Sequence, residues 1–159
     1  MANNRRVARE CALKMLFAHR FADKAGASPQ LLDHFWSHFR FADDALGEPL
    51  DTEGAPLATA TRVFAEQIVR GVIDYRAVLD EKIAAVAKHW SLERMAPVDL
   101  SILRIGAYEL LYSKEVPVPV AIDEAVEIAK RYGTKDSPAF VNGLLDKIAQ
   151  NVKPSETCA

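Results

Sequence analysis

Apolar residues recur at steps of three and four positions along most of the chain, the spacing that places them on one face of an α-helix. No segment alternates apolar and polar residues for long enough to form a strand. The pattern therefore predicts an all-α fold of about six or seven helices. The predicted helices are Arg5 to about Lys24, Gln30 to about Ala45, one or two nearly continuous helices from Thr59 to about Trp90, Pro97 or Val98 to Tyr112, Pro117 to about Arg131, and Pro138 onward.

The stretch from Val116 to Ala149 contains the clearest helix start and stop signals. Gly133 predicts a left-handed stop at the end of one helix. Asp136 or Ser137 is then the expected N-cap of the next helix, with Pro138 at its first position, where a proline needs no amide partner. The two helices should lie on either side of a short turn.

Asn142 and Gly143 interrupt the apolar pattern inside the last predicted helix. A glycine there costs about 1 kcal/mol relative to alanine. We interpret it as a point of close packing against another helix, with a ligand-facing role as the alternative.

The segment VDLSILRIGAYELLY is apolar on nearly every side, which is typical of a helix at the centre of a bundle. Arg104 lies midway along it and must reach a carboxylate or water. We interpret Arg104 as a structural salt-bridge partner, with a contribution to a basic surface site as the alternative.

Charge is distributed unevenly along a chain of 159 residues and net charge −2. We expect residues 1–159 to form a single domain, with an acidic mobile loop at 47–56 and a short polar tail at 153–159. The first twenty residues hold most of their charge as cations. These cations are Arg5, Arg6, Arg9, Lys14 and Arg20, against Glu10 alone.

Arginines in the first turns of a helix oppose its dipole, so Arg5, Arg6 and Arg9 do not serve helix stability. Phosphate binding is one interpretation of this cluster. A solvated charged face, with Arg6 paired to Glu10 one turn later, is the other.

Several classes of protein are excluded by what the sequence lacks. No apolar run approaches the ~18 residues needed to cross a bilayer, so a soluble cytoplasmic protein is expected. Cys11 and Cys158 lie at opposite ends and should be reduced thiols. His34 and His38 are one turn apart but lack an evident third ligand, so we expect neither a metal nor a cofactor.

Three segments in order, RRVARECALKMLF, ILRIGAYELLY and VPVPVAIDEAVEIAKRYGTKDSPAFVNGLLDKI, resemble the bacterial NusB family of transcription antitermination factors. The resemblance implies two small packed helical bundles without catalytic activity. It also implies binding of boxA-type single-stranded RNA together with NusE, a ribosomal small-subunit protein. Such a complex helps RNA polymerase to read through terminators.

The resemblance places RNA contacts at both ends of the chain. It assigns Arg5, Arg6 and Arg9, the aromatic residues Tyr132 and Phe140, and Asp136, which holds RNA affinity down in the family. The NusE side is expected near Phe17 and Asp99. Lys130, Arg131 and Lys135 could add cations along the phosphates, while aromatic rings stack on bases.

Two other functions are left open by the sequence. Val7 replaces a third consecutive arginine of the family motif, and the net charge is negative, so a helical protein-interaction scaffold that does not bind RNA is the alternative. RNA-modifying methyltransferases can carry a NusB-like domain, but no Gly-rich strand–turn–helix unit is present for a nucleotide cofactor. Either a monomer or a homodimer is compatible with the sequence.

Overall fold

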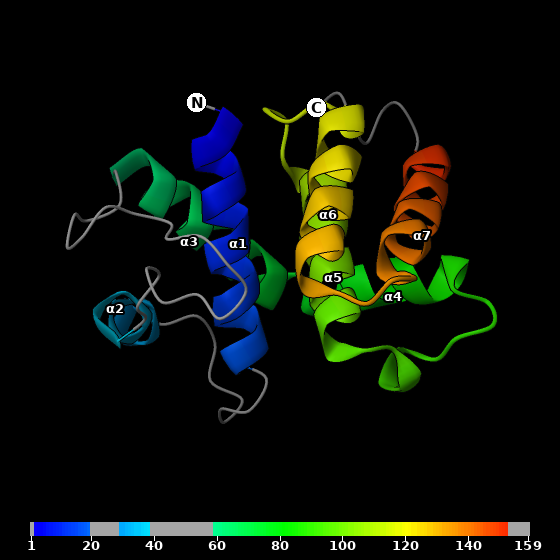
Figure 1. Cartoon of the computed structure of the whole chain (residues 1–159), viewed down its shortest axis with the longest axis horizontal. Helices are drawn as coiled ribbons and strands as arrows, with labels where there is room; N and C mark the ends of the chain where they lie inside the picture. The colour runs from blue at the N-terminus through cyan, green and yellow to red at the C-terminus, as the bar shows by residue number, and fades with distance from the viewer. Residues whose placement is uncertain (1, 20–28, 39–58, 153–159) are drawn as a thin grey trace. The chain divides into compact units, whose positions relative to one another are not determined.

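The computed structural model describes residues 2–19, 29–38 and 59–152. Within these ranges it has seven α-helices and one short 3₁₀ helix but no strand, which confirms the all-α class (Figure 1). The helices are α1 (Ala2–His19), α2 (Pro29–His38), α3 (Thr59–Asp74), α4 (Arg76–Val86), the 3₁₀ helix η2 (Leu92–Arg94), α5 (Pro97–Tyr112), α6 (Val118–Tyr132) and α7 (Ser137–Asn151). The predicted ends of the first two helices, the acidic loop at 47–56 and the tail at 153–159 lie outside the described residues.

The chain divides into two compact units, Met1–Asp74 and Tyr75–Ala159. Their boundary is Tyr75, whose backbone angles (φ −102°, ψ 15°) lie outside the helical region and separate α3 from α4. The sequence predicted either one long helix or two nearly continuous helices after Thr59, and the structure has two. That the whole chain acts as one domain stays a prediction.

In the first unit, α1 packs along α3 (Figure 1). Apolar residues at helical spacing make this contact because they come to one face of each helix. Cys11 is buried within this contact. The other fully or nearly fully buried apolar residues of the two helices are Ala8, Ala12, Leu13, Met15, Ala65, Ile68, Val69 and Val72.

An aromatic contact links α2 to α3. Trp36 Nε1 donates a 2.7 Å hydrogen bond to Glu66 Oε1, and the guanidinium of Arg62 lies 5.0 Å from the centroid of the Trp36 ring. Arg62 also forms ion pairs with Asp33 and Glu66 at 3.7 and 3.6 Å. These contacts tie Trp36 and Asp33 of α2 to Arg62 and Glu66 of α3.

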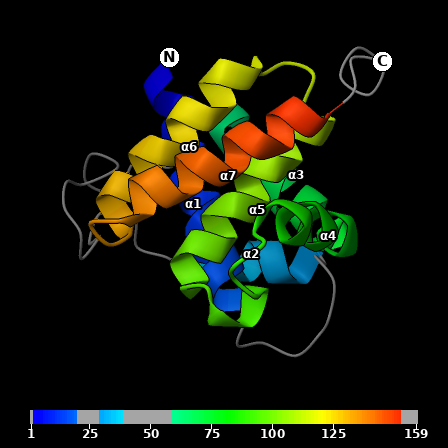
Figure 2. The same ribbon diagram turned by 90° about the vertical axis from the view of Figure 1, so that its right-hand side faces the viewer.

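In the second unit, α5 packs against α4, α6 and α7, and α6 and α7 lie side by side (Figure 2). The prediction of a central buried helix is confirmed. Gly106 lies at its contact with α7, where an added Cβ would lie 2.6 Å from Leu145 Cδ1. The buried residues of α5 are Asp99, Ser101, Ile102, Leu103, Ile105, Gly106, Ala107, Glu109 and Leu110.

Arg104 is a structural salt-bridge partner, as predicted. Its Nε and Nη2 donate to the two carboxylate oxygens of Asp80 at 2.7 and 3.0 Å, in the two-pronged geometry that arginine favours. Only 14% of the Arg104 side chain is exposed. The pair joins α4 to α5 at the edge of the core.

One prediction about the turn between α6 and α7 is wrong, and another is confirmed in position only. Gly133 has φ −94° and ψ −166°, so the backbone is extended rather than left-handed. Glycine is required there for space, because a Cβ would lie 2.5 Å from Ser137 and 2.9 Å from the Ala129 carbonyl oxygen. Asp136 is the N-cap residue of α7, one of the two predicted positions, but its side chain makes no capping hydrogen bond.

Thr134 and Ser137 satisfy each other across this turn instead. The backbone N–H of Thr134 donates to Ser137 Oγ at 2.9 Å, and the backbone N–H of Ser137 donates to the Thr134 carbonyl oxygen at 3.1 Å. Ser137 is buried within the first turn of α7 rather than before it. This reciprocal pair fixes the angle at which the chain enters α7.

The interpretation of Gly143 as a close-packing position is wrong. Gly143 and Asn142 are exposed on α7, and a Cβ built on Gly143 would meet no described atom within 4 Å. The close approach between helices occurs at Gly106 instead.

Candidate nucleic-acid interface

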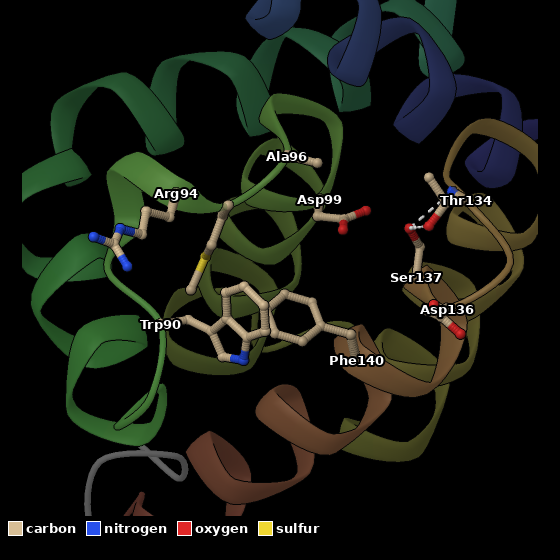
Figure 3. A pocket seen from close by; sticks show the side chains of 9 residues that line it. Trp90, Arg94, Ala96, Asp99, Thr134, Asp136, Ser137 and Phe140 are labelled. Carbon is tan, nitrogen blue, oxygen red and sulfur yellow. Dashed lines mark hydrogen bonds between the residues drawn. The ribbon is translucent and has the colours of Figure 1, made fainter.

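A pocket of about 210 Å³ opens on the second unit where three segments meet. Its walls come from the chain between α4 and α5, the first turn of α5, and the turn that leads into α7 (Figure 3). The lining residues are Trp90, Arg94, Met95, Ala96, Asp99, Thr134, Asp136, Ser137 and Phe140. Three of the residues predicted as site residues, Asp99, Asp136 and Phe140, are thus brought together.

Two aromatic rings form one wall of the pocket. Trp90 and Phe140 meet edge to face, with centroids 6.3 Å apart and an interplanar angle of 78°. Trp90 is 56% exposed and Phe140 is partly exposed, so flat apolar surface faces solvent here. Such surface can accept a nucleobase by stacking.

Asp99 provides a carboxylate deep in the same pocket. It lies in the first turn of α5, where the helix dipole favours an acid. This helix begins at Pro97 and has no side-chain cap. Asp99 is only 9% exposed, and its Oδ1 has no hydrogen-bond partner among the described residues. Figure 3 shows the side chain pointing toward Thr134 and Ser137.

The predicted cations of the second unit lie at the end of α6 and in the following turn. Lys130 is exposed and forms an ion pair with Glu127 at 3.0 Å, and such surface pairs contribute little energy. The guanidinium of Arg131 lies 5.6 Å from the centroid of the Tyr132 ring, and Lys135 is exposed in the turn. These side chains are available at the surface of the same unit as the pocket.

The arginines of α1 belong to the first unit and are not equivalent to one another. Arg5 is exposed, whereas Arg9 is only 2% exposed. The guanidinium groups of Arg5 and Arg9 lie 4.9 and 5.2 Å from the centroid of the Phe64 ring of α3, which places Phe64 within cation–π range of both. Arg6 is partly exposed.

Comparison with known proteins decides the family. The NusB family model matches residues 6–150. Transcription antitermination protein NusB of Syntrophotalea carbinolica is 51% identical over 150 residues, which cover 94% of each chain. NusB of Geobacter sulfurreducens is 45% identical over 148 residues, covering 93% of this chain and 95% of that protein.

The chain belongs to the NusB family. It is accordingly a transcription antitermination protein of a family that is not enzymatic.

Solved NusB structures agree with this assignment. The structure of T. maritima NusB has a TM-score of 0.75 and 35% identity, and the match covers 96% of this chain and 95% of that one. A structure of antitermination factors NusB and NusE in complex with dsRNA has a TM-score of 0.71 over 96% of this chain. At 21% identity the latter likeness shows the fold alone.

Sequence reasoning missed several residues that the NusB-family fold brings to these sites. Trp90 stands only at the end of a predicted helix, and Arg94 lies between that helix and the next predicted one. Phe64 falls inside a predicted helix, yet its ring contacts two arginines. A tryptophan at the end of a predicted helix, four residues before an arginine in the following connection, is the sequence signal that could have identified the pocket.

Two further features are absent from the described ranges. Among these residues no group of three His, Cys, Asp or Glu side chains is arranged to hold a metal ion. No helix in them is long and apolar enough to span a bilayer.

Proposed function

We propose that this chain binds boxA-type single-stranded RNA together with NusE, as part of the RNA polymerase antitermination complex in the cytoplasm. The observation that carries the proposal is 51% identity to a transcription antitermination protein NusB across nearly the whole chain. A NusB homologue has also been solved with NusE and RNA.

The RNA-binding surface that we propose combines cations with exposed rings. Arg5 and Arg6 in the first unit are at least partly exposed, and phosphates of single-stranded RNA are bound by such side chains. In the second unit, cations and aromatic groups occur at and beside the pocket. These are Lys130, Arg131, Tyr132, Lys135 and Phe140, with Asp136 as an acid that lowers affinity for phosphate.

The proposed role of Arg9 is different from that of Arg5 and Arg6. Because Arg9 is almost fully buried and lies over Phe64, it is better placed to hold α1 against α3 than to meet a phosphate. The NusE side of the proposal involves Phe17, which is partly exposed on α1, and Asp99. Whether the protein also forms a homodimer is tested by the mass of the complex that it forms with NusE.

Replacing Arg5 and Arg6 together with alanine should weaken binding of boxA RNA and reduce its salt dependence. Each phosphate contact to a single strand contributes about 0.7 to the slope of log K against log salt concentration, so losing two should lower the slope by about 1.4. The measurement is a fluorescence titration of labelled boxA RNA at several salt concentrations, in the presence of NusE.

The matched control replaces Lys82 and Lys147, which are exposed on α4 and α7, with alanine and so removes the same charge. It should leave the slope close to that of the wild type. Equal slopes for the two double variants would show that Arg5 and Arg6 do not contact phosphate. A separate Arg9→Ala variant should lose stability rather than alter the slope.

A further inference from the structure

Phe64 of α3 has no assigned role in RNA binding, although its ring contacts two of the arginines that the resemblance assigns to RNA. The guanidinium carbons of Arg5 and Arg9 lie 4.9 and 5.2 Å from the centroid of this ring, within cation–π range. All three residues belong to the first unit, in which α1 packs along α3 (Figure 1). The geometry of this contact therefore depends on one unit alone.

The two arginines differ in exposure although they lie one helical turn apart on α1. Residues four apart in a helix are neighbours on its surface, so both side chains can reach one ring of a packed helix. Arg9 is only 2% exposed, whereas Arg5 is exposed and Phe64 is partly exposed. The ring therefore contacts one buried arginine and one arginine that solvent, and hence a ligand, can reach.

A cation–π contact is compatible with phosphate binding by the same arginine. The contact uses the flat face of the guanidinium, whereas the N–H groups that bind a phosphate lie at its edge. An arginine side chain also has several rotatable bonds, whose freedom is lost when it binds a phosphate. A ring that already restricts the side chain reduces this loss and so strengthens binding.

We infer that Phe64 is a positioning residue for RNA binding, which holds Arg5 over its ring so that the guanidinium meets a phosphate of the RNA backbone. This inference rests on the proposed RNA-binding function and adds to it a residue of α3 that the resemblance does not assign. Phe64 acts through Arg5 and does not itself touch the RNA. Arg9, which is buried at the same ring, belongs to the packing of α1 on α3.

A packing role without any part in binding is the competing explanation for Phe64. Ile68 and Val72 of the same helix are almost fully buried, as packing residues are, whereas Phe64 is partly exposed. A ring that only filled the contact between two helices would not need an exposed arginine over it. Helix stability does not account for Arg5 either, because a cation near the start of α1 opposes the helix dipole.

The test compares boxA RNA binding by Phe64→Leu, Arg5→Ala and the variant that carries both substitutions. Leucine keeps an apolar side chain on α3 but removes the ring. Phe64→Leu alone should weaken binding about 2- to 5-fold, the factor that corresponds to a cation–π contact at an exposed site. In the Arg5→Ala background it should have no further effect, because no guanidinium is left to position. Binding is titrated with the full chain in the presence of NusE.

Two control variants separate positioning from packing. Phe64→Tyr keeps an aromatic ring and should bind boxA RNA nearly as wild type does. Ile68→Val alters a buried side chain of the same helix without changing the ring or either cation, and it should leave RNA affinity unchanged. Thermal melting shows whether each variant is folded at the temperature of the titration. If Phe64→Leu does not fold, Phe64→Met takes its place in the comparison.

The outcomes separate the inference from the function on which it rests. An equal loss of affinity on replacing Phe64 in both backgrounds would overturn the inference, since Phe64 would then act without Arg5. Unchanged binding by Phe64→Leu, with weaker binding by Arg5→Ala, would overturn it and leave the phosphate role of Arg5 intact. If neither substitution changes the affinity, both roles are wrong while RNA binding stands. Failure of wild type to bind boxA RNA with NusE would remove the proposed function itself.

Discussion

Replacing Phe140 with alanine should weaken binding of boxA RNA about 5- to 150-fold while changing the free energy of unfolding only slightly. The factor corresponds to the ~1–3 kcal/mol that stacking of one base on an aromatic ring contributes. Phe140 is partly exposed at the pocket and contacts Trp90 edge to face, so alanine removes accessible ring surface rather than a core side chain. RNA titration and chemical denaturation of the same variant measure the two quantities.

Phe140→Tyr is the matched control because it keeps an aromatic ring at the same place, and it should bind RNA nearly as wild type does. A fully buried phenylalanine would behave differently, since its replacement by alanine costs about 3–5 kcal/mol of stability. A loss of that size without a change in RNA affinity would mean that Phe140 is a packing residue. The pocket would then have no stacking wall on the α7 side.

Replacing Leu145 with alanine should lower the free energy of unfolding by about 2–5 kcal/mol. Leu145 is fully buried in α7, and its Cδ atoms lie where a Cβ on Gly106 of α5 would clash. Alanine would leave a cavity at the contact between these helices. Urea denaturation gives the change in the midpoint and in the unfolding free energy.

Gly143→Ala provides the control within the same helix. Because Gly143 is exposed and has open space around it, alanine should raise stability by about 0.5–1 kcal/mol by restricting the unfolded chain. A destabilising Gly143→Ala would contradict the open space around this glycine. RNA affinity measured alongside will show whether the ligand-facing alternative for Gly143 holds.

The segments that form helices were predictable because helix formation depends on local sequence patterns. The apolar spacing identified every helix from Thr59 onward, and Pro97 and Val98 marked the start of α5 within a residue. A charged residue in an apolar helix predicted a buried ion pair, but not that Asp80 would be the partner of Arg104. The choice of partner depends on which turns of α4 and α5 come together, and the sequence pattern does not contain it.

Positions where glycine has a steric role were harder to predict. A Gly after a helix usually indicates a left-handed residue, yet Gly133 is extended and makes room for Ser137. A Gly inside a helix usually indicates close packing, yet that is true of Gly106 and not of Gly143. Both errors have one cause, because the neighbour that excludes a side chain comes from tertiary packing.

The candidate site was only partly visible in the sequence. The resemblance named Asp99, Asp136 and Phe140 without indicating that they share a pocket. Trp90 and Arg94 were missed because they lie in a short connection whose path is set by the helices on either side. The burial of Arg9 was missed because a cation over an aromatic ring can be buried where sequence reasoning expects exposure.

The most direct test of the proposed function is the mass of the complex that the full chain forms with NusE, measured with and without boxA RNA. We expect one copy each of this chain, NusE and RNA in a single complex, with a scrambled RNA of the same length bound far more weakly. A mass with two copies of this chain would establish a homodimer in addition. A complex with NusE that excludes boxA RNA would contradict the RNA-binding account and favour a protein-interaction scaffold.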